Sequence, residues 1–289
     1  MKNLTVIIPS FNEEKAVSDT IIKLKPFSEK HSWKIIVVND GSEDATKTIL
    51  EKFGFIKTMC HKINRGYGAS LKTGIVAAET ELVAFYDADG QHNPEDLERL
   101  WLEWNDEDMI VGKRVKGSHI DLSRTPGKWI LSITANFLAG RKIPDLNSGL
   151  RIVKKDIIMK YLHLFPDGFS FSTTSTIAFL SDKRVVEYRS ITTNKRMGKS
   201  SVRQLKDGFN TVLLILRLIT LFNPLKVFMP ASISLVFLSA IYEIIWGYIY
   251  SPHLRLLPGA LLTFLTGIII FFFALIMDQI SQIRRGSIK

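Results

Sequence analysis

Residues 4–14 read LTVIIPSFNEE, an apolar run that stops at Pro9 and continues into polar residues. A second apolar run, IIVV at residues 35–38, leads in the same way into Asn39-Asp40-Gly41-Ser42. Short runs rich in β-branched residues that end at turn residues are typical of buried parallel strands. Each run therefore predicts a buried strand followed by a polar loop.

The rest of the N-terminal region alternates between helical and strand patterns. Apolar spacing predicts helices at residues 13–30, 43–53 and 67–78, a weak strand near 55–60 and a strand at 81–86. Strands that alternate with helices over about 110 residues indicate an open, mostly parallel sheet with helices on both faces. In such sheets the ligand binds beyond the carboxyl ends of the strands, so we expect the polar loops to meet at one edge.

Residues 92–206 have a mixed pattern. We expect strands at 108–112, near 149–153 and near 184–192, and a helix at 126–140. These elements would extend the same α/β domain.

A third polar loop, Asp87-Ala88-Asp89-Gly90-Gln91, directly follows the strand predicted at 81–86. Two carboxylates one residue apart repel each other and are stabilised by a cation between them. Carboxylate and amide oxygens suit Mg²⁺ or Mn²⁺, and substrate phosphates usually complete the shell of such an ion. A pair of this kind also occurs in solvated turns, but its place after a strand favours a metal site for a diphosphate. The neighbouring His92 is interpreted as a turn residue rather than a metal ligand.

The loops after the first two strands each have two readings. Phe11 offers an aromatic face for stacking on a nucleobase, and Glu13 can accept hydrogen bonds from the base edge. The alternative is a helix start, in which Asn12 caps the helix and the acidic residues favour its dipole. Asp40 likewise either belongs to a capped turn or contacts a base or ribose. The pattern alone leaves both roles open.

The composition is average for a soluble protein, with 46% apolar and 23% charged residues among 289, but the charge is unevenly spread. From Arg196 onward ten lysines and arginines stand against three acidic residues, which places +7 of the formal net charge of +10 in the last third. The composition excludes a disordered chain, a collagen and a disulfide scaffold. The single cysteine, Cys60, cannot form an internal disulfide and fits a reducing compartment.

The last third also holds two long apolar segments. Residues 227–250 contain one charge, Glu243, and residues 256–277 contain none; each segment is long enough to cross about 30 Å of hydrocarbon. Residues 208–222 have the pattern of an interfacial amphipathic helix. Because lysines and arginines flank the two segments on their outer sides, we expect both flanks in the cytoplasm and the loop 251–255 outside. Glu243 is either functional, as an intramembrane carboxylate, or reaches the interface near the outer end of its span.

Four motifs, in this order and spacing, resemble glycosyltransferase family 2, and more narrowly the polyprenyl-phosphate glycosyltransferases of the dolichyl-phosphate mannose synthase type. They are VIIPSFNEE at 6–14, VVNDGSEDAT at 37–46, NRGYGASLKTGI at 64–75 and FYDADGQHNPED at 85–96. The resemblance covers residues 4–206 and implies the A-type nucleotide-diphospho-sugar transferase fold, an α/β fold, with a divalent metal. The two apolar segments resemble the membrane hairpin of the anchored members.

This resemblance implies a domain order and a set of site residues. We expect a catalytic domain at 1–206, an interfacial helix at 207–225 and a two-helix transmembrane hairpin at 226–289. The positions that match the family's nucleotide-binding residues are Pro9, Phe11, Glu13, Val38, Asp40, Asp87 and Ala88. The positions that match its metal site are Asp87, Asp89 and Gln91.

Downstream motifs match the family's acceptor region. These are Gly112-Lys113-Arg114, DLNSGLR at 145–151 and the basic loop KRMGKS at 195–200. The residues that the resemblance assigns to the acceptor phosphate are Arg114, Arg151, Arg196, Lys199 and Ser200, and those it assigns to catalysis are Asp89, Arg114, Arg196 and Lys199. Guanidinium groups suit phosphate. The alternative is a solvated basic face attracted to anionic lipid, worth about 1 kcal/mol per residue.

We therefore expect a metal-dependent, inverting glycosyltransferase that transfers a sugar from a nucleotide-diphosphate sugar to a polyprenyl phosphate, undecaprenyl or dolichyl, with Mg²⁺ or Mn²⁺ as cofactor. It would be a multi-pass protein of the plasma membrane with its catalytic domain and both termini in the cytoplasm. We expect no nucleic-acid partner, and the sequence leaves open whether the protein is a homo-oligomer.

Two alternatives carry different signatures. A processive polysaccharide synthase usually has Gln-x-x-Arg-Trp before its membrane channel, whereas here Gln282–Arg285 follows the last span and lacks the tryptophan. A catalytically inactive sugar-nucleotide-binding membrane scaffold is the other alternative, and the intact pair Asp87 and Asp89 argues against it.

Overall fold

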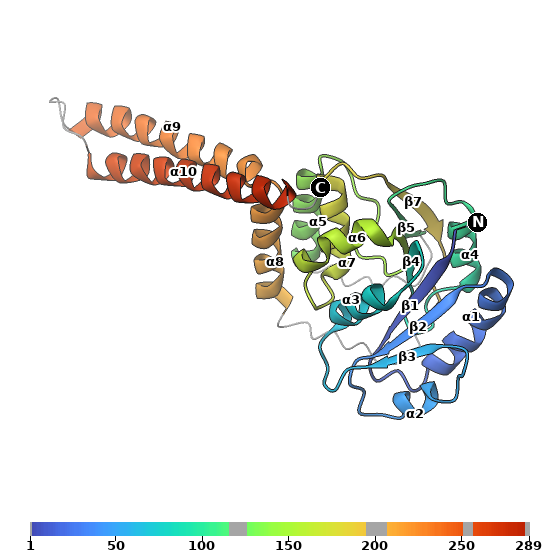
Figure 1. Ribbon diagram of the computed structural model, residues 1–289. Coiled ribbons are helices and arrows are strands. Elements are labelled where there is room, and N and C mark those ends of the chain that lie inside the picture. Colours follow the sequence, from blue (N-terminus) through green and yellow to red (C-terminus); the bar gives the residue numbers. More distant parts are fainter. Residues whose placement is uncertain (1, 116–125, 195–206, 251–256, 287–289) are drawn as a thin grey trace. The chain divides into compact units, whose positions relative to one another are not determined.

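The computed structural model describes residues 2–115, 126–194, 207–250 and 257–286. The chain divides into two compact units, Met1–Phe209 and Asn210–Lys289. The first is built around a sheet, and the second contains two long apolar helices (Figure 1).

A seven-stranded sheet forms the centre of the first unit, in the order β3-β2-β1-β4-β6-β5-β7. Every pairing is parallel except those of β6, which runs antiparallel to β4 and β5. This confirms the mostly parallel sheet that the alternation of patterns predicts. The strands are β1 Leu4–Ser10, β2 Lys34–Asn39, β3 Lys57–Cys60, β4 Leu82–Phe85, β5 Met109–Arg114, β6 Arg151–Lys154 and β7 Val186–Ile191.

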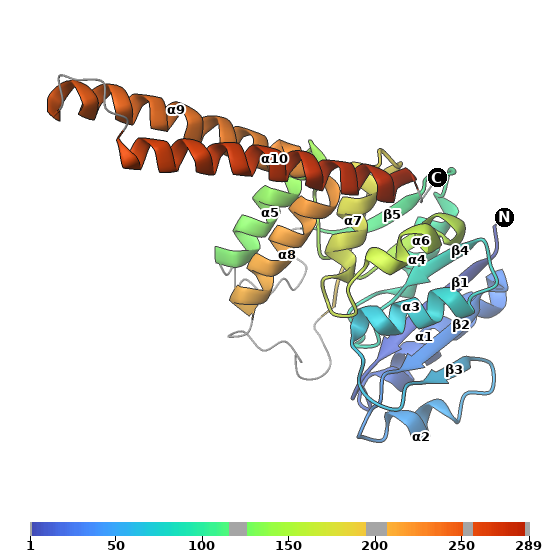
Figure 2. The same ribbon diagram turned by 60° about the vertical axis from the view of Figure 1, so that its left-hand side comes forward.

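Helices cover both faces of this sheet (Figure 2). One group packs through contacts among α1, α2 and α4, and the other through contacts among α3, α5, α6 and α7. The helices of the first unit are α1 Val17–His31, α2 Thr46–Leu50, α3 Tyr67–Ala77, α4 Pro94–Leu102, α5 Pro126–Ala139, α6 Lys155–Tyr161, the short 3₁₀ helix Leu162–Leu164, and α7 Phe171–Ser181.

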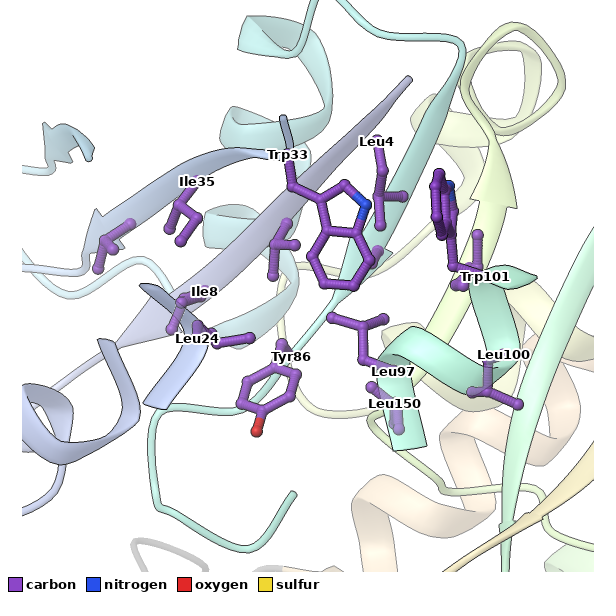
Figure 3. Close-up of a cluster of buried hydrophobic side chains, with 14 of the residues drawn as sticks. Leu4, Ile8, Leu24, Trp33, Ile35, Tyr86, Leu97, Leu100, Trp101 and Leu150 are labelled. Atoms are coloured by element: carbon purple, nitrogen blue, oxygen red, sulfur yellow. The ribbon is translucent and has the colours of Figure 1, made fainter. Parts of the chain in front are cut away.

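The alternation of side chains along β1 explains why both faces are covered. Leu4 and Ile8 belong to a buried apolar cluster on one face, together with Leu24 of α1 and Leu97 of α4 (Figure 3). Ile7 points to the opposite face, because successive side chains of a strand alternate. There α3 packs so closely that a Cβ at Gly74 would lie 2.3 Å from Ile7 Cγ2.

The predicted elements of the first unit are present, with two shortened helices and three additional α-helices. The helix expected at 13–30 begins only at Val17, and the one expected at 43–53 covers Thr46–Leu50. Its start is fixed by Asp44, whose Oδ1 accepts the Thr46 N–H at 3.0 Å. α4, α6 and α7 are not among the predicted elements. α7 is buried on all sides up to Leu180, so it has no polar stripe that would give a helical period.

The second unit contains α9 (Pro224–Tyr250) and α10 (Pro258–Gly286), and α8 (Asp207–Phe222) precedes them in the chain. α9 and α10 lie side by side (Figure 1), and Ser232 Oγ donates to Gly267 O at 2.8 Å between them. By length and composition, both helices can cross a membrane. Small residues at the contact allow this close approach, since a Cβ at Gly267 would lie 2.9 Å from Val236 Cγ2.

Glu243 has a partner at the far end of the hairpin. Its Oε2 accepts the N–H of Leu257 at 3.1 Å, directly before α10 begins at Pro258. The first N–H groups of a helix have no partner within the helix, so an acceptor placed there caps it. Glu243 therefore joins the two apolar helices by capping the second.

Candidate functional site

The loops after β1 and β2 are tied to each other. Asn12 N–H donates to Ser42 Oγ at 3.0 Å, and Glu43 N–H donates to Asn12 Oδ1 at 2.9 Å. Asn12 has a left-handed φ of 54°, a conformation that asparagine adopts more readily than most residues. Phe11 and Glu13, on either side of it, are half-buried. The structure thus places both predicted base contacts at the carboxyl edge of the sheet.

Three residues matched to nucleotide binding are buried and apolar: Pro9, Val38 and Ala88. Pro9 and Val38 are opposite each other in the β1–β2 pairing, and the carbonyl of Ala88 accepts a hydrogen bond from Thr20 Oγ1 at 3.1 Å. Their side chains carry no hydrogen-bonding group. Their contact with a nucleotide stays a prediction.

Asp40 is held by three hydrogen bonds. Its Oδ1 lies 2.6 Å from His61 Nδ1 and accepts the Arg65 N–H at 3.0 Å, while its Oδ2 accepts the Gly66 N–H at 2.7 Å. His61 Nε2 in turn lies 2.9 Å from Thr73 Oγ1 on α3. The carboxylate is 2% exposed. These hydrogen bonds hold the turn that leads into α3, a contact that the sequence pattern did not reveal. The contact of Asp40 with a nucleotide stays a prediction.

The first carboxylate of the acidic pair, Asp87, is also held from outside its own loop. Tyr67 OH donates to Asp87 Oδ1 at 3.0 Å, and His92 Nε2 lies 3.1 Å from Asp87 Oδ2. Burial, and then the negative charge of Asp87, raise the pKa of Tyr67 well above its usual value, so its hydroxyl stays protonated as a donor. His92, interpreted from the sequence as a turn residue, thus contacts the acidic pair directly.

The second carboxylate, Asp89, is positioned by its own turn. Asp89 Oδ1 accepts the Gln91 N–H at 3.1 Å, across Gly90 with a left-handed φ of 75°. Gln91 Nε2 lies 3.5 Å from Asn194 O. The turn therefore helps to hold Asp89, and Gln91 is also joined to Asn194, whose N–H donates to Gln91 O at 2.9 Å.

The donor set at this edge fits a hard divalent ion. Asp87 and Asp89 offer carboxylate oxygens and Gln91 an amide oxygen, the ligand types that Mg²⁺ and Mn²⁺ prefer. Within the described residues there is no group of three or more His, Cys, Asp or Glu side chains placed to hold a metal. Such a sparse set suits an ion that takes its remaining ligands from a diphosphate and water.

Arg114, at the end of β5, forms a two-pronged ion pair with Asp145. Its Nε lies 2.8 Å from Asp145 Oδ2 and its Nη2 lies 2.9 Å from Asp145 Oδ1. The hydrogen bonds to Asp145 raise the pKa of Arg114. Burial raises the pKa of Asp145, but the pairing with Arg114 outweighs it and leaves that pKa lowered. The Arg114 side chain remains 33% exposed, so one edge of it can still meet a substrate.

Arg151 does not reach the surface, which corrects its assignment to the acceptor phosphate. Its side chain is fully buried, with Nε donating to Ser148 O at 2.8 Å and Nη2 to Leu146 O at 3.1 Å. Nη1 donates to Thr176 Oγ1 at 2.7 Å and to Ser175 Oγ at 3.3 Å. Arg151 therefore supports the loop between α5 and β6 from below and presents no guanidinium to a ligand.

The other residues that the resemblance assigns to the acceptor phosphate are Arg196, Lys199 and Ser200. They lie outside the described residues.

The glycines of NRGYG serve a packing role. A Cβ at Gly66 would lie 2.5 Å from Asp167 O, and one at Gly68 would lie 2.3 Å from Pro166 O. The loop before α7 thus presses directly on the start of α3, and its Phe169 ring stacks on Tyr67 with centroids 5.7 Å apart. Tyr67 lies within this motif, but nothing in the local sequence indicates that its hydroxyl reaches Asp87.

Two protein-family models match this chain. Residues 5–162 match Glycosyl transferase family 2, and residues 223–283 match the GtrB C-terminal hairpin. The first covers the sheet through β6 and the second covers α9 and most of α10.

Curated relatives resemble the first region. An uncharacterized protein of Methanocaldococcus jannaschii is 34% identical over 167 residues, which span 54% of this chain and 67% of that protein. Dodecaprenyl-phosphate galacturonate synthase of Rhizobium johnstonii is 29% identical over 164 residues, which span 54% of this chain and 48% of the synthase. The chain thus spans about half the length of the second relative. Further relatives are dolichyl-phosphate and undecaprenyl-phosphate sugar transferases.

A solved structure shows the same fold. Glucosyl-3-phosphoglycerate synthase from Mycobacterium tuberculosis, in complex with Mn²⁺, UDP and glucosyl-3-phosphoglycerate, superimposes with a TM-score of 0.59 at 16% identity. The match covers 76% of this chain and 79% of that one. Together with the mostly parallel sheet, it confirms the expected A-type fold.

Proposed function

This chain belongs to glycosyl transferase family 2, and we propose that it transfers a sugar, with inversion, from a nucleotide-diphosphate sugar to a polyprenyl phosphate. One observation carries the proposal: the same chain combines a rigidly held acidic pair at the carboxyl edge of the sheet with an apolar hairpin of the GtrB type. Relatives that act on polyprenyl phosphates support the lipid acceptor.

The donor would bind over the ends of β1, β2 and β4. Phe11 and Glu13 would contact the nucleobase, and the loop fixed by Asp40 would line the ribose side. Asp87, Asp89 and Gln91 would hold Mg²⁺ or Mn²⁺. Such an ion, when bound, neutralises the charge that develops on the leaving diphosphate.

The acceptor would be bound by cationic side chains. Arg114 would use the edge that Asp145 leaves exposed, and Arg196, Lys199 and Ser200 would complete the phosphate site. A phosphate monoester has a second pKa near 6 and is largely ionised at neutral pH. It can therefore attack the anomeric carbon without a strong general base.

The hairpin would anchor the protein in the plasma membrane. The positive flanks favour both termini in the cytoplasm and the loop 251–255 outside, so the transfer would take place at the cytoplasmic face. Reporter fusions at each terminus and in this loop test the arrangement. A catalytic domain exposed to protease on the outer face of intact cells would contradict it.

The activity is tested with the full-length protein purified in detergent. It is incubated with a panel of nucleotide sugars, Mn²⁺, and either undecaprenyl or dolichyl phosphate, and the lipids are analysed by mass spectrometry. We expect a glycosyl phosphoprenol from at least one donor, and none from the Asp89→Asn variant. Donor hydrolysis without any lipid product, across the whole panel, would count against the lipid acceptor.

The acceptor site is tested by alanine variants of Lys195, Arg196, Lys199 and Arg203. If Arg196 and Lys199 bind the phosphate, their variants raise the acceptor KM or lower kcat by about ten- to a hundredfold, the range expected for a hydrogen-bonded charge. Donor affinity should stay near that of the wild type. An equal, modest and salt-sensitive loss across all four variants would instead indicate a general attraction to anionic lipid.

A further inference from the structure

We propose that Tyr67, His92 and Gly149 are positioning residues that fix the Asp87 carboxylate for the metal and the donor diphosphate. The inference rests on the proposed function, because it assumes that Asp87 serves a metal–nucleotide site. It assigns roles to three residues that come from three separate parts of the chain.

Tyr67 approaches Asp87 from the start of α3. Its hydroxyl donates to Asp87 Oδ1 at 3.0 Å, and its ring is stacked on Phe169 at an interplanar angle of 18°. The stack holds the ring from one side, while the first turn of α3 holds its backbone. Two independent contacts therefore define where the hydroxyl lies.

His92 approaches the other oxygen of the same carboxylate. Its side chain is 5% exposed, and Nε2 lies 3.1 Å from Asp87 Oδ2. Because an ionised carboxylate only accepts hydrogen bonds, we assign the ring proton to Nε2. Tyr86 fixes the backbone of His92, because its hydroxyl donates to His92 O at 2.5 Å. The rings of Tyr86 and His92 also lie edge to face. This arrangement orients the imidazole for one partner.

Gly149 closes the third side. A Cβ at this position would lie 2.1 Å from Asp87 Oδ2 and 2.9 Å from Asp87 Cγ, closer than any carbon can approach. The backbone there is not left-handed, so space alone requires glycine. Buried Arg151 supports this wall, because it binds the carbonyls of Leu146 and Ser148.

The Asp87 carboxylate is thus held by residues from outside its own loop. It contacts Tyr67 of α3, His92 and the loop before β6. Groups that orient a metal ligand by hydrogen bonds typically change metal affinity ten- to a hundredfold when they are removed. Substitutions at Tyr67, His92 and Gly149 should therefore act on metal binding through Asp87.

The test measures Mn²⁺ affinity by electron paramagnetic resonance of free Mn²⁺, with the full-length protein in detergent and with UDP or GDP present. Tyr67→Phe keeps the stack on Phe169 and removes only the hydroxyl. We expect its Mn²⁺ affinity to fall about tenfold, with the melting temperature nearly unchanged. Tyr161→Phe is the matched control, because Tyr161 OH donates to Asp182 Oδ2 at 2.8 Å on a different part of the domain; it should leave Mn²⁺ affinity unchanged.

His92→Asn and Gly149→Ala extend the test. Both should weaken Mn²⁺ binding to a similar degree, whereas Gly54→Ala, where an added Cβ meets no atom within 4 Å, should not. Combining Tyr67→Phe with Asp87→Asn separates a positioning role from a structural one. If Tyr67 acts through Asp87, the double variant binds Mn²⁺ no more weakly than Asp87→Asn alone.

The outcomes separate this inference from the proposed function. If wild-type protein binds Mn²⁺ with a nucleotide but glycosylates no prenyl phosphate, the proposed acceptor is wrong and the positioning roles still hold. Mn²⁺ affinities of Tyr67→Phe and His92→Asn within twofold of wild type would overturn the inference. So would a wild-type protein that binds no Mn²⁺ with either nucleotide, or full additivity with Asp87→Asn.

Discussion

Replacement of Arg151 by alanine tests whether this residue binds a substrate or supports the fold. In the wild type its guanidinium makes four hydrogen bonds to oxygen atoms inside the domain, two of them to the carbonyls of Leu146 and Ser148. The other two go to Ser175 and Thr176, whose hydroxyls also donate to Ser172 O at 3.0 Å and so keep a partner. Arg151→Ala therefore leaves two buried carbonyls without a donor.

The expected loss of stability follows from these two carbonyls. A buried polar group left without a partner costs about 1–3 kcal/mol, or about 2–6 kcal/mol for two. Part of this is offset, because burial already disfavours the charged side chain and lowers the pKa of Arg151. After this offset, we expect Arg151→Ala to lower the free energy of unfolding by about 3 kcal/mol. For a domain of this size, that lowers the melting temperature by about 6–12 °C.

The assay is thermal unfolding of the full-length variant, with Lys23→Ala as the control. The Lys23 side chain is 52% exposed and pairs with Asp19, which is 41% exposed, so its loss should cost no more than about 1 kcal/mol. An unchanged melting temperature of Arg151→Ala, together with a raised KM for the acceptor, would refute the structural role and restore phosphate binding.

Three further predictions concern the metal, the ion pair and the hairpin. Asp89→Asn should abolish sugar transfer, and excess chelator should do the same to the wild type until Mn²⁺ is restored; full activity in chelator would contradict the metal role. Arg114 lowers the pKa of Asp145, so the stabilisation from this pair is complete above the unfolded pKa of about 3.9 and is lost as the pH falls through the lowered value. In urea unfolding at a series of acidic pH values, the free energy of unfolding of Asp145→Asn should therefore depend less on pH than that of the wild type. Glu243→Ala should remove the cap at Leu257 and lower the stability of the hairpin by about 0.5–2 kcal/mol. Glu243→Gln keeps an acceptor oxygen, so its protease resistance in detergent should match that of the wild type. Inactivation by Glu243→Gln alone would instead indicate a catalytic or transport role for the carboxylate.

The β-branched runs and the polar loops after them predicted the central strands, because burial of a parallel strand on both faces demands continuous apolar residues. The same pattern placed the loops after β1, β2 and β4 at one edge, and the hydrogen bonds between Asn12 and the 42–43 turn confirm that the first two meet. The two apolar helices were evident from their length and their single charge, Glu243, within residues 227–250 and 256–277. These features depend on local periodicity, which the sequence displays directly.

Other elements have no such local signal. α7 is buried on every side, so its polar and apolar residues do not separate into two faces, and the sequence shows no helical period. The antiparallel direction of β6 depends on which neighbours it pairs with, and nothing within Arg151–Lys154 indicates that choice.

The sequence by itself determined the strands of the first unit and some of its helices, the polar loops, the acidic pair and the apolar hairpin. Only the tertiary structure decided the contacts of the polar side chains: it buried Arg151 under the loop before β6, joined Asp40 by hydrogen bonds to the turn before α3, and surrounded Asp87 with Tyr67, His92 and Gly149. The physical reason is that a hydrogen bond or a close contact depends on the distance between atoms. Residues far apart in the chain acquire that distance only when the sheet brings their loops together.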